Sequence, residues 1–298
     1  MSVPQILLIS SHVVRGRIGL RGASFAIERL GVPCWVLPTV TLPWHPGHGP
    51  ASRVVPDAQS FQTLIDDLKG APWRSELGAV ITGYLGSVEQ AASIRDFIVS
   101  LKAENPELIY CCDPVIGDEG GLYVPEGTAA AIRDTLVPLA DMVTPNRFEF
   151  DWLTGKTHFT NEDILETAKS INASKVAVTS AFPIMKQSTA TLLWDDASET
   201  GLLAEHRAFE NAPNGPGDLF TALFTARVLL GAKPAKALET ATAGVFEMLA
   251  QTVKKEMDEL VLVEEQTRLE RPMAMVNMRR LTGNVVKKKG VVVTPKPL

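Results

Sequence analysis

Apolar residues follow two alternating patterns along the chain. Short runs rich in β-branched and aromatic residues, typical of strands, cover residues 5–11, 33–40, 77–84, 107–116, 141–145 and 175–181. Between them, residues 87–106 and 161–174 repeat apolar positions at helical spacing. This alternation predicts an α/β fold in which a mainly parallel sheet is covered by helices on both faces, as a three-layer α/β/α sandwich.

Polar side chains follow directly after several of these apolar runs. The carboxyl ends of parallel strands meet at one edge of a sheet, and ligands bind there. The candidates at that edge are Ser10, Ser11 and His12, then Tyr84, Asp113, Thr144 to Asn146, and Thr179 with Ser180.

The longest irregular stretch, residues 37–57, contains five prolines, two histidines and two glycines. A regular helix cannot run through so many prolines. Loops of this length are often lids or disordered segments. The tryptophan and the histidines favour a flap that touches a ligand, although a surface loop without a role explains the composition nearly as well.

The charge balance argues against a nucleic-acid partner. The 298 residues include 29 Lys and Arg against 34 Asp and Glu, a net charge of -5, with no long block of one sign. Three lysines within residues 285–293 are the nearest approach to a basic patch, and we interpret them as a solvated turn of an edge hairpin. Because no repeat or linker divides the chain, we expect residues 1–298 to form a single domain.

Cysteines and apolar runs indicate a cytoplasmic protein without a membrane segment. The three cysteines, two of them adjacent, fit neither a disulfide framework nor a zinc spacing, so we expect reduced core residues. The first residues show no basic leader or cleavage site, and no apolar run approaches the roughly 20 residues of a membrane helix.

Residues 211–231 place a glycine-rich turn before an abrupt apolar run. Pro216 suits the first turn of a helix, and Asp218 is a favourable anion near the positive end of that helix. Glycines there also let backbone amides approach a phosphate, and a carboxylate just after them can meet the attacking group. Locally, Asp218 is therefore either a helix-start anion or a phosphoryl-transfer base. Residues 233–255 predict a second helix packed beside the first.

Two further motifs have equally plain alternatives. Asp113 closes a strand and Asp118 follows in a glycine-rich loop, a pair that suits either a hydrated magnesium ion or ordinary turns. Asn146 and Glu149 stand three apart at a predicted helix start. Phosphates and their metal bind favourably at such a place, but a simple capping box has the same spacing.

Together, the three motifs resemble those of the ribokinase-like small-molecule kinases. The superfamily pattern is the Gly-x-Gly-Asp of residues 215–218 with the Asn-x-x-Glu of residues 146–149. The stretches SHVVRG, TGYLG and DPVIGD followed by LYVP are most similar to the pyridoxal kinases. The resemblance covers nearly the whole chain. It implies a ribokinase-like fold, phosphorylation of the 5'-hydroxymethyl group of vitamin B6 vitamers by ATP, Mg²⁺ as the metal and a homodimer, and it leaves a monovalent-cation requirement open.

The resemblance also implies roles for residues at matching positions. Asp218 would accept the proton of the substrate hydroxyl, and the backbone of Gly215 and Gly217 would face the transferred phosphoryl group. The other implied roles are substrate contacts for Ser11, Val14, His45, Tyr84 and Tyr123, with Asp218; ATP contacts for Asp113, Thr144, Asn146, Glu149, Thr179, Ser180 and Gly217; and metal contacts for Asp118 and Glu149.

The chain departs from this family at two places. Pro216 stands between two glycines where the family usually carries Thr or a small residue, and it removes one backbone donor. In the flap, His45 matches the family histidine, Pro46 replaces the hydroxyl residue that follows it, and Trp44 offers a face to a pyridine ring. Two alternatives stay open: a hydroxymethylpyrimidine or sugar kinase of the same fold, and a vitamer-binding protein that has lost turnover.

Overall fold

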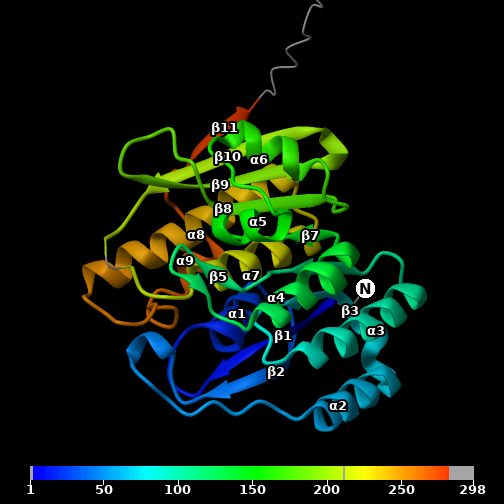
Figure 1. Ribbon diagram of the computed structural model, residues 1–298. Coiled ribbons are helices and arrows are strands. Elements are labelled where there is room, and N and C mark those ends of the chain that lie inside the picture. Colours follow the sequence, from blue (N-terminus) through cyan, green and yellow to red (C-terminus); the bar gives the residue numbers. More distant parts are fainter. Residues whose placement is uncertain (1–2, 211, 282–298) are drawn as a thin grey trace, which may run out of the picture.

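The computed structural model describes residues 3–210 and 212–281 and is built around a nine-stranded sheet (Figure 1). In the described part, the strands lie in the order β11-β10-β9-β8-β7-β4-β3-β1-β2. Their bounds are β1 Gln5–Val13, β2 Cys34–Leu42, β3 Leu77–Thr82, β4 Ile109–Cys112, β7 Met142–Val143, β8 Lys175–Ala181, β9 Ser188–Asp195, β10 Thr200–Arg207 and β11 Asn277–Leu281. A separate ribbon pairs β5 (Gly117–Asp118) with β6 (Gly121–Leu122).

In the sheet, the neighbouring strands β2, β1, β3, β4, β7 and β8 pair in parallel. Strands β9, β10 and β11 extend the sheet in antiparallel fashion. The prediction of a mainly parallel sheet is confirmed. The antiparallel extension is absent from the sequence prediction. Most residues of β9 are buried, and a strand buried on both faces lacks the alternation that marks a surface hairpin.

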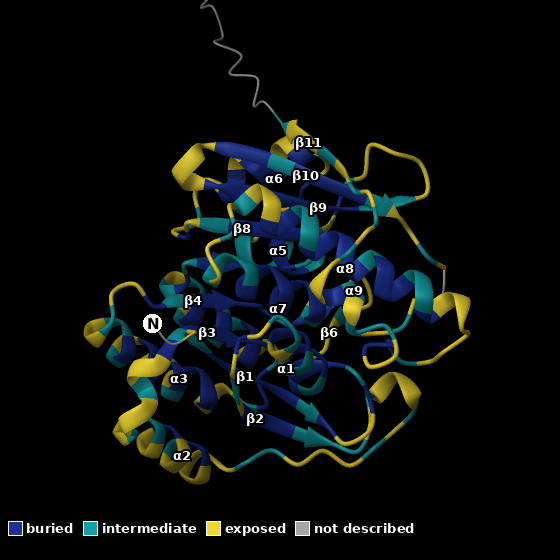
Figure 2. Ribbon diagram, turned by 180° about the vertical axis from the view of Figure 1, so that it is seen from behind, coloured by how far each residue is buried: buried dark blue, intermediate teal, exposed yellow. Residues whose placement is uncertain are grey.

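Helices cover both faces of the sheet and enclose two separate apolar cores (Figures 1 and 2). One face carries α1 (Gly19–Arg29), α7 (Pro216–Leu229), α8 (Pro234–Lys254) and α9 (Thr267–Glu270). The other carries α2 (Ala58–Gly70), α3 (Val88–Glu104), α4 (Glu126–Ala131), α5 (Arg147–Thr154) and α6 (Asn161–Ala168). Single helical turns span Pro46–His48, Pro72–Glu76, Ile132–Leu136, Val137–Leu139 and Asp196–Ser198. The predicted three-layer sandwich is confirmed.

Two predicted boundaries are wrong. Residues 37–42 pair with β1 as the end of β2, so the irregular segment begins at Pro43; residues 43–57 are called the flap from here on. Pro38 is tolerated inside β2 because this strand lies at the edge of the sheet. The helix expected over residues 161–174 ends at Ala168. The lysines of residues 285–293 lie outside the described residues.

The expectation of core cysteines holds for Cys111 and Cys112, which are buried and free, whereas Cys34 is free but only partly buried. The predicted second helix is α8, which packs beside α7. Among the helices described, none has both the length and the apolar composition needed to cross a bilayer.

Candidate active site

Asp218 lies in the first turn of α7, where the chain after β1 meets it. Gly215 caps this helix in a left-handed conformation with φ +105°, and Pro216 occupies the first helical position. The amide of Gly19 donates a 2.9 Å hydrogen bond to Asp218 Oδ2. Burial raises the pKa of the Asp218 carboxyl above its ordinary value, and the Gly19 hydrogen bond offsets part of that rise. The carboxylate is thus held in place and made more basic than a free one.

The glycine loop before Asp218 is suited to an anion. A Cβ on Gly215 would lie 2.8 Å from Ile18 Cγ2, so a larger residue does not fit there without movement. Apart from its chain neighbours and its own helix backbone, no described residue has an atom within 4 Å of a Cβ built on Gly217. In the first turn of a helix, backbone amides have no carbonyl partner four residues back. Pro216 stands at such a position, so it breaks no hydrogen bond of the helix.

Asp113 forms a buried polar cluster directly after β4. The Thr221 hydroxyl, on α7, donates a 2.8 Å hydrogen bond to Asp113 Oδ2 and lies 2.9 Å from the Thr144 hydroxyl. Burial raises the pKa of Asp113 well above its usual range, and the charges of Glu149 and Asp218 raise it further. The cluster therefore joins the ends of β4 and β7 to the helix that carries Asp218.

Asn146 and Glu149 form the capping box that their spacing predicts. The Glu149 amide donates to Asn146 Oδ1 at 2.9 Å, and the Asn146 amide donates to Glu149 Oε2 at 2.8 Å. The other carboxylate oxygen accepts the amide of Ile116 at 3.0 Å, and the Gly117 amide lies 3.4 Å from it. Burial raises the pKa of Glu149 to about 8 although these amides lower it. Since Glu149 is 4% exposed, capping alone does not explain so costly a burial.

Asp118 lies on the β5–β6 ribbon, in surroundings that differ from those of the buried Glu149. It is exposed, it accepts the Gly120 amide at 2.7 Å, and it is hydrogen-bonded by the hydroxyl of Tyr123. Burial, and then the hydrogen bond with Asp118, raise the pKa of Tyr123. These two predicted site residues therefore contact each other rather than the buried carboxylates.

The donor set fits a hydrated metal better than a closed metal cage. Within residues 3–210 and 212–281, no three His, Cys, Asp or Glu side chains gather around a common point. Mg²⁺ usually keeps several waters and combines one or two carboxylates with phosphate oxygens. A nearby cation would lower the pKa of Asp113, which burial and then the charges of Glu149 and Asp218 raise. Asp113 and Glu149 thus fit a cation held through water.

A cleft of about 330 Å³ opens on one side of the α7 start. Its walls combine hydroxyl and apolar side chains from β8, β9, β10, α7 and α8: Thr179, Ser180, Thr189, Thr191, His206, Ala208, Phe209, Ala212, Pro216, Gly217, Phe220, Thr242, Val245 and Leu249. Ser180 has a left-handed backbone, φ +53°, which is uncommon for a residue with a side chain. The predicted pair Thr179 and Ser180 therefore shares one cleft with the glycine loop.

A second, water-sized cavity of about 10 Å³ adjoins Asp218 itself. It is lined by Leu8, Ser10, Gly19, Ala23, Ile81, Gly83, Asp113, Asp218, Thr221 and Ala222. Ser11 lies close by, since a Cβ on Gly19 would come within 2.5 Å of its hydroxyl oxygen. Both hollows border the first turn of α7, because Pro216 and Gly217 line the cleft and Asp218 lines the cavity.

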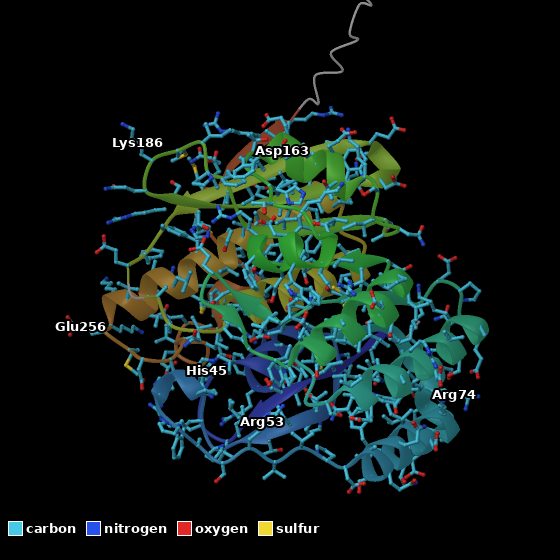
Figure 3. The ribbon with its side chains drawn as sticks, in the orientation of Figure 1. His45, Arg53, Arg74, Asp163, Lys186 and Glu256 are labelled. Atoms are coloured by element: carbon cyan, nitrogen blue, oxygen red, sulfur yellow. The ribbon has the colours of Figure 1, made fainter. Side chains whose placement is uncertain are left out.

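The remaining substrate candidates lie around the flap. Val14 and Tyr123 are exposed, and Tyr84 is partly buried. Arg53 of the flap lies over the Tyr84 ring, 5.9 Å from its centroid, and donates to the Gly86 carbonyl at 2.8 Å. Figure 3 shows His45 and Arg53 on the segment that follows β2.

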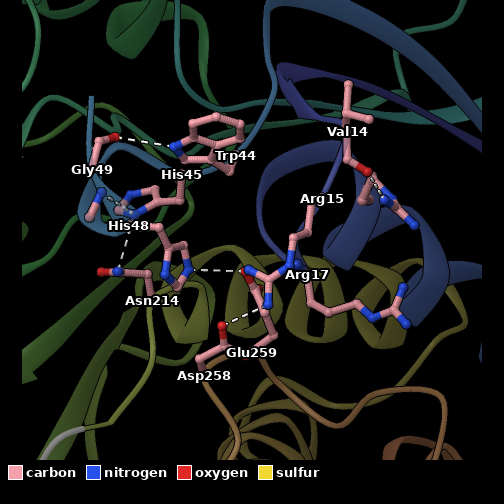
Figure 4. A network of polar contacts seen from close by, with 12 residues as sticks. Val14, Arg15, Arg17, Trp44, His45, His48, Gly49, Asn214, Asp258 and Glu259 are labelled. Atoms are coloured by element: carbon pink, nitrogen blue, oxygen red, sulfur yellow. Dashed lines mark hydrogen bonds and ion pairs between the residues drawn. The ribbon is translucent and has the colours of Figure 1, made fainter. Parts of the chain in front are cut away.

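His45 connects the flap to the glycine loop. Its Nδ1 accepts the Gly47 amide at 3.0 Å and lies 3.1 Å from Asn214 Nδ2 (Figure 4). Burial, and then the charge of His48, lower the pKa of His45. A neutral ring with an unprotonated Nδ1 satisfies both amide donors.

Four contributors lie beyond the site residues named from the sequence. Gly19 holds Asp218, Thr221 holds Asp113, Arg53 covers Tyr84, and Glu259 contacts the flap. Thr221 had a local signal, because it follows Asp218 by three positions and therefore shares its helical face. The other three act across long sequence separations, for which a single sequence carries no signal.

Comparison with known proteins places this architecture. A family model described as phosphomethylpyrimidine kinase matches residues 62–261. Pyridoxal kinase PdxY of Pseudomonas entomophila (strain L48) is 34% identical, over 93% of this chain and 98% of that protein, and PdxY of Corynebacterium diphtheriae is 30% identical, over 93% and 99%. The structure of Leishmania donovani pyridoxal kinase with ADP and pyridoxine superimposes with a TM-score of 0.86 at 23% identity, over 93% of this chain and 99% of that one. The chain therefore belongs to the pyridoxal kinase family and has its ribokinase-like fold.

Proposed function

We propose that the protein is an ATP-dependent pyridoxal kinase that phosphorylates the 5'-hydroxymethyl group of pyridoxal, and of pyridoxine and pyridoxamine as further substrates. The observation that carries this proposal is the position of Asp218. It lies at a helix start, where it lines a small cavity while the preceding Pro216 and Gly217 line a cleft of about 330 Å³, and its carboxylate is fixed by the Gly19 amide. Family membership supplies the substrate class.

Asp218 acts as the base. It accepts the proton of the substrate hydroxyl as the oxygen attacks the γ-phosphorus, and the bond from that phosphorus to the ADP oxygen breaks. The raised pKa of Asp218 makes it a better proton acceptor than a free aspartate. The backbone of Gly215 and Gly217 faces the negative charge of the transferred group, at the positive end of α7.

The nucleotide occupies the larger cleft. Thr179 and Ser180 contact the nucleotide from the end of β8, and Gly217 contacts its phosphates. The ends of β4 and β7 complete the phosphate region with Asp113, Thr144, Asn146 and Glu149. Glu149 and Asp118, with Asp113, would hold Mg²⁺ through water, and the ion would neutralise charge on the phosphates.

The vitamer lies between Asp218 and the flap. Ser11 hydrogen-bonds the pyridine ring, Val14 forms an apolar wall, and Tyr84 packs against the ring. His45 and Tyr123 border the same pocket from the flap and from the β5–β6 ribbon. A flat aromatic substrate needs such stacking walls, whereas a sugar needs a denser set of polar groups.

Family resemblance also supports a homodimeric, cytoplasmic enzyme acting in vitamin B6 salvage. Light scattering of the purified protein tests the dimer, and turnover with and without potassium tests a monovalent-cation requirement. The prediction that residues 1–298 form one kinase domain is tested by thermal or urea unfolding, for which we expect a single cooperative transition.

The decisive experiment measures phosphate transfer from ATP with Mg²⁺ to pyridoxal, pyridoxine, pyridoxamine and hydroxymethylpyrimidine, with Asp218→Asn in parallel. Turnover of a B6 vitamer that collapses in the variant while binding persists is the expected result. Preferred turnover of hydroxymethylpyrimidine would instead indicate the related pyrimidine kinase. Vitamer binding without any turnover would indicate a binding protein.

A further inference from the structure

Glu259, in the loop after α8, contacts the flap and the segment of residues 14–19 that follows β1, called the 14–19 loop (Figure 4). Its Oε1 lies 3.1 Å from His48 Nε2 of the flap and 3.6 Å from an Arg15 guanidinium nitrogen. Its Oε2 accepts the backbone amide of Arg17 at 2.9 Å. The Glu259 side chain is 14% exposed, whereas its partners His48 and Arg15 are 29% and 56% exposed, so water screens this carboxylate less than it screens a fully exposed one.

The Arg17 contact leads directly to the catalytic carboxylate. Arg17 precedes by two positions Gly19, whose amide holds Asp218 at 2.9 Å. Between them, Ile18 packs against the glycine loop, because a Cβ on Gly215 would lie 2.8 Å from Ile18 Cγ2. Displacing the Arg17 amide therefore displaces the donor that orients Asp218.

The backbone of the 14–19 loop is shaped around the Glu259 carboxylate. Gly16 has φ +134°, and a Cβ built on it would lie 3.1 Å from Glu259 Oε1. Leu260, which follows Glu259 in the chain, is buried, and its Cδ1 would lie 3.5 Å from a Cβ built on Gly215. The turn at residues 259–260 thus supports the 14–19 loop and the start of α7 from one side.

The flap has a second anchor at the same place. His45 lies 3.1 Å from Asn214, the residue before Gly215, while His48 contacts Glu259. Both histidines flank or belong to the single helical turn Pro46–His48. The flap is therefore attached to the two segments whose positions determine the geometry at Asp218.

We propose that Glu259 is a positioning residue that couples the flap to Asp218. Through His48 it holds the flap over the vitamer, and through the Arg17 amide it holds the loop that orients the base. This inference rests on the proposed kinase function, because the flap closes over the acceptor substrate and the base acts on it.

Two substitutions separate the two contacts. Glu259→Gln keeps an oxygen that accepts the Arg17 amide but removes the charge that attracts Arg15 and His48. We expect a vitamer KM raised several-fold, an unchanged ATP KM and a kcat within about twofold of wild type. Glu259→Ala removes both contacts, and we expect kcat to fall about tenfold as well, the rate equivalent of one hydrogen bond to a charged group.

Two further variants serve as partner and control. His48→Ala should raise the vitamer KM as Glu259→Gln does, and combining the two should add little. Asp258→Asn removes the neighbouring exposed carboxylate, which pairs with Arg15 at 2.7 Å, and should leave all constants unchanged.

Hydrogen exchange tests whether Glu259 holds the flap, and it needs no substrate. The amides of Gly47, His48 and Gly49 are hydrogen-bonded within the flap turn. They should exchange faster in Glu259→Gln and Glu259→Ala than in wild type or Asp258→Asn. Wild-type exchange in Glu259→Ala would overturn the proposal, as would equal KM increases for ATP and vitamer. If wild type phosphorylates no vitamer, the proposed function fails, while the exchange result still decides whether Glu259 holds the flap.

Discussion

The two sides of the Asp218 site are built in different ways. The donor side, on which we propose that ATP binds, consists of strand ends and helix starts. Asp113 and Glu149 are buried there, Asn146 is partly buried, and all three are hydrogen-bonded by neighbouring backbone or hydroxyl groups. On the acceptor side, where we propose that the vitamer binds, the flap is anchored by contacts between segments far apart in the chain. His48 contacts Glu259, which is 211 positions away, and His45 contacts Asn214, which is 169 positions away. The donor side is therefore part of the core, whereas the acceptor side is an exposed segment fastened by a few side chains.

This difference indicates which side moves. Buried groups within the sheet edge open only with the fold, while loops held by few contacts open locally. We therefore expect substitutions on the donor side to affect stability and chemistry together, and substitutions at the flap to affect mainly vitamer binding.

The largest effect is expected where the two sides meet. Asp218→Asn keeps the shape of the side chain but removes the proton acceptor, so kcat should fall about 100-fold to 10,000-fold. Rapid-quench measurement of phosphate transfer checks the rate, and calorimetry checks that ATP still binds. Asp196→Asn, an exposed carboxylate in the turn after β9, is the control. A wild-type rate in Asp218→Asn would place the base on another residue.

Gly19→Ala should have the next largest effect. Gly19 has φ +53°, and its Cβ would lie 2.4 Å from the Ser11 carbonyl oxygen, so the amide that holds Asp218 must shift. We expect a free energy of unfolding lower by roughly 1–3 kcal/mol and a kcat reduced at least tenfold. Urea denaturation and steady-state kinetics measure the two effects.

Gly31→Ala is the matched control for strain alone. Gly31 also has a left-handed backbone, φ +79°, but among the residues that the structure describes, none beyond its chain neighbours has an atom within 4 Å of its Cβ position. It should lose stability without losing kcat. If Gly19→Ala behaves in the same way, the Gly19 hydrogen bond does not position the base.

Much of the donor side can be predicted from the sequence, for a physical reason. Asn146 and Glu149 form their contacts within one helical turn, and Asp113 stands directly after a strand, so local spacing reports their geometry. The parallel core of the sheet follows from the same short-range patterns. Contacts such as that of Glu259 with His48 depend on how distant segments pack, and local spacing does not encode them. Asp118 illustrates the limit, since its turn chemistry is clear but its contact with Tyr123 is not.

Glu149 should make stability depend on pH. Its pKa is about 8 in the folded protein against an ordinary value of 4.5, so the folded state holds this proton more tightly than the unfolded chain does. The resulting stabilisation is complete below the ordinary value and is lost as the pH rises to the folded value. Urea midpoints of the nucleotide-free protein should therefore fall between about pH 5 and about pH 8.

Glu149→Gln removes that contribution. The amide stays neutral at every pH and can still accept one backbone hydrogen bond, so the fall in stability over this range should become shallower. The variant also removes a charge that raises the pKa of Asp113, and this second change flattens the fall in the same direction. An identical pH dependence in the two proteins would show that Glu149 is ionised throughout.

The smallest expected effect on activity concerns two threonines on α8, and it tests whether nucleotide fills the cleft of about 330 Å³. Thr242 is 2% exposed, lines the cleft, and its hydroxyl has no partner among the described residues. Thr252 is fully buried, and its hydroxyl donates to the Met248 carbonyl at 2.7 Å and accepts the Val261 amide at 3.2 Å. Valine has the shape of threonine without the hydroxyl. Thr242→Val should therefore change stability by less than about 1 kcal/mol, whereas Thr252→Val should cost roughly 1–3 kcal/mol because it leaves a buried amide unpaired.

Nucleotide binding should reverse that order. If the Thr242 hydroxyl meets a polar edge of ATP, Thr242→Val raises the ATP KM a few-fold, and Thr252→Val leaves it unchanged because its hydroxyl serves only the fold. Steady-state kinetics at saturating vitamer measures the ATP KM of both variants, and urea denaturation measures their stability. An unchanged ATP KM in Thr242→Val would mean that nucleotide does not reach this wall, and that the cleft is filled from its Thr179 side alone.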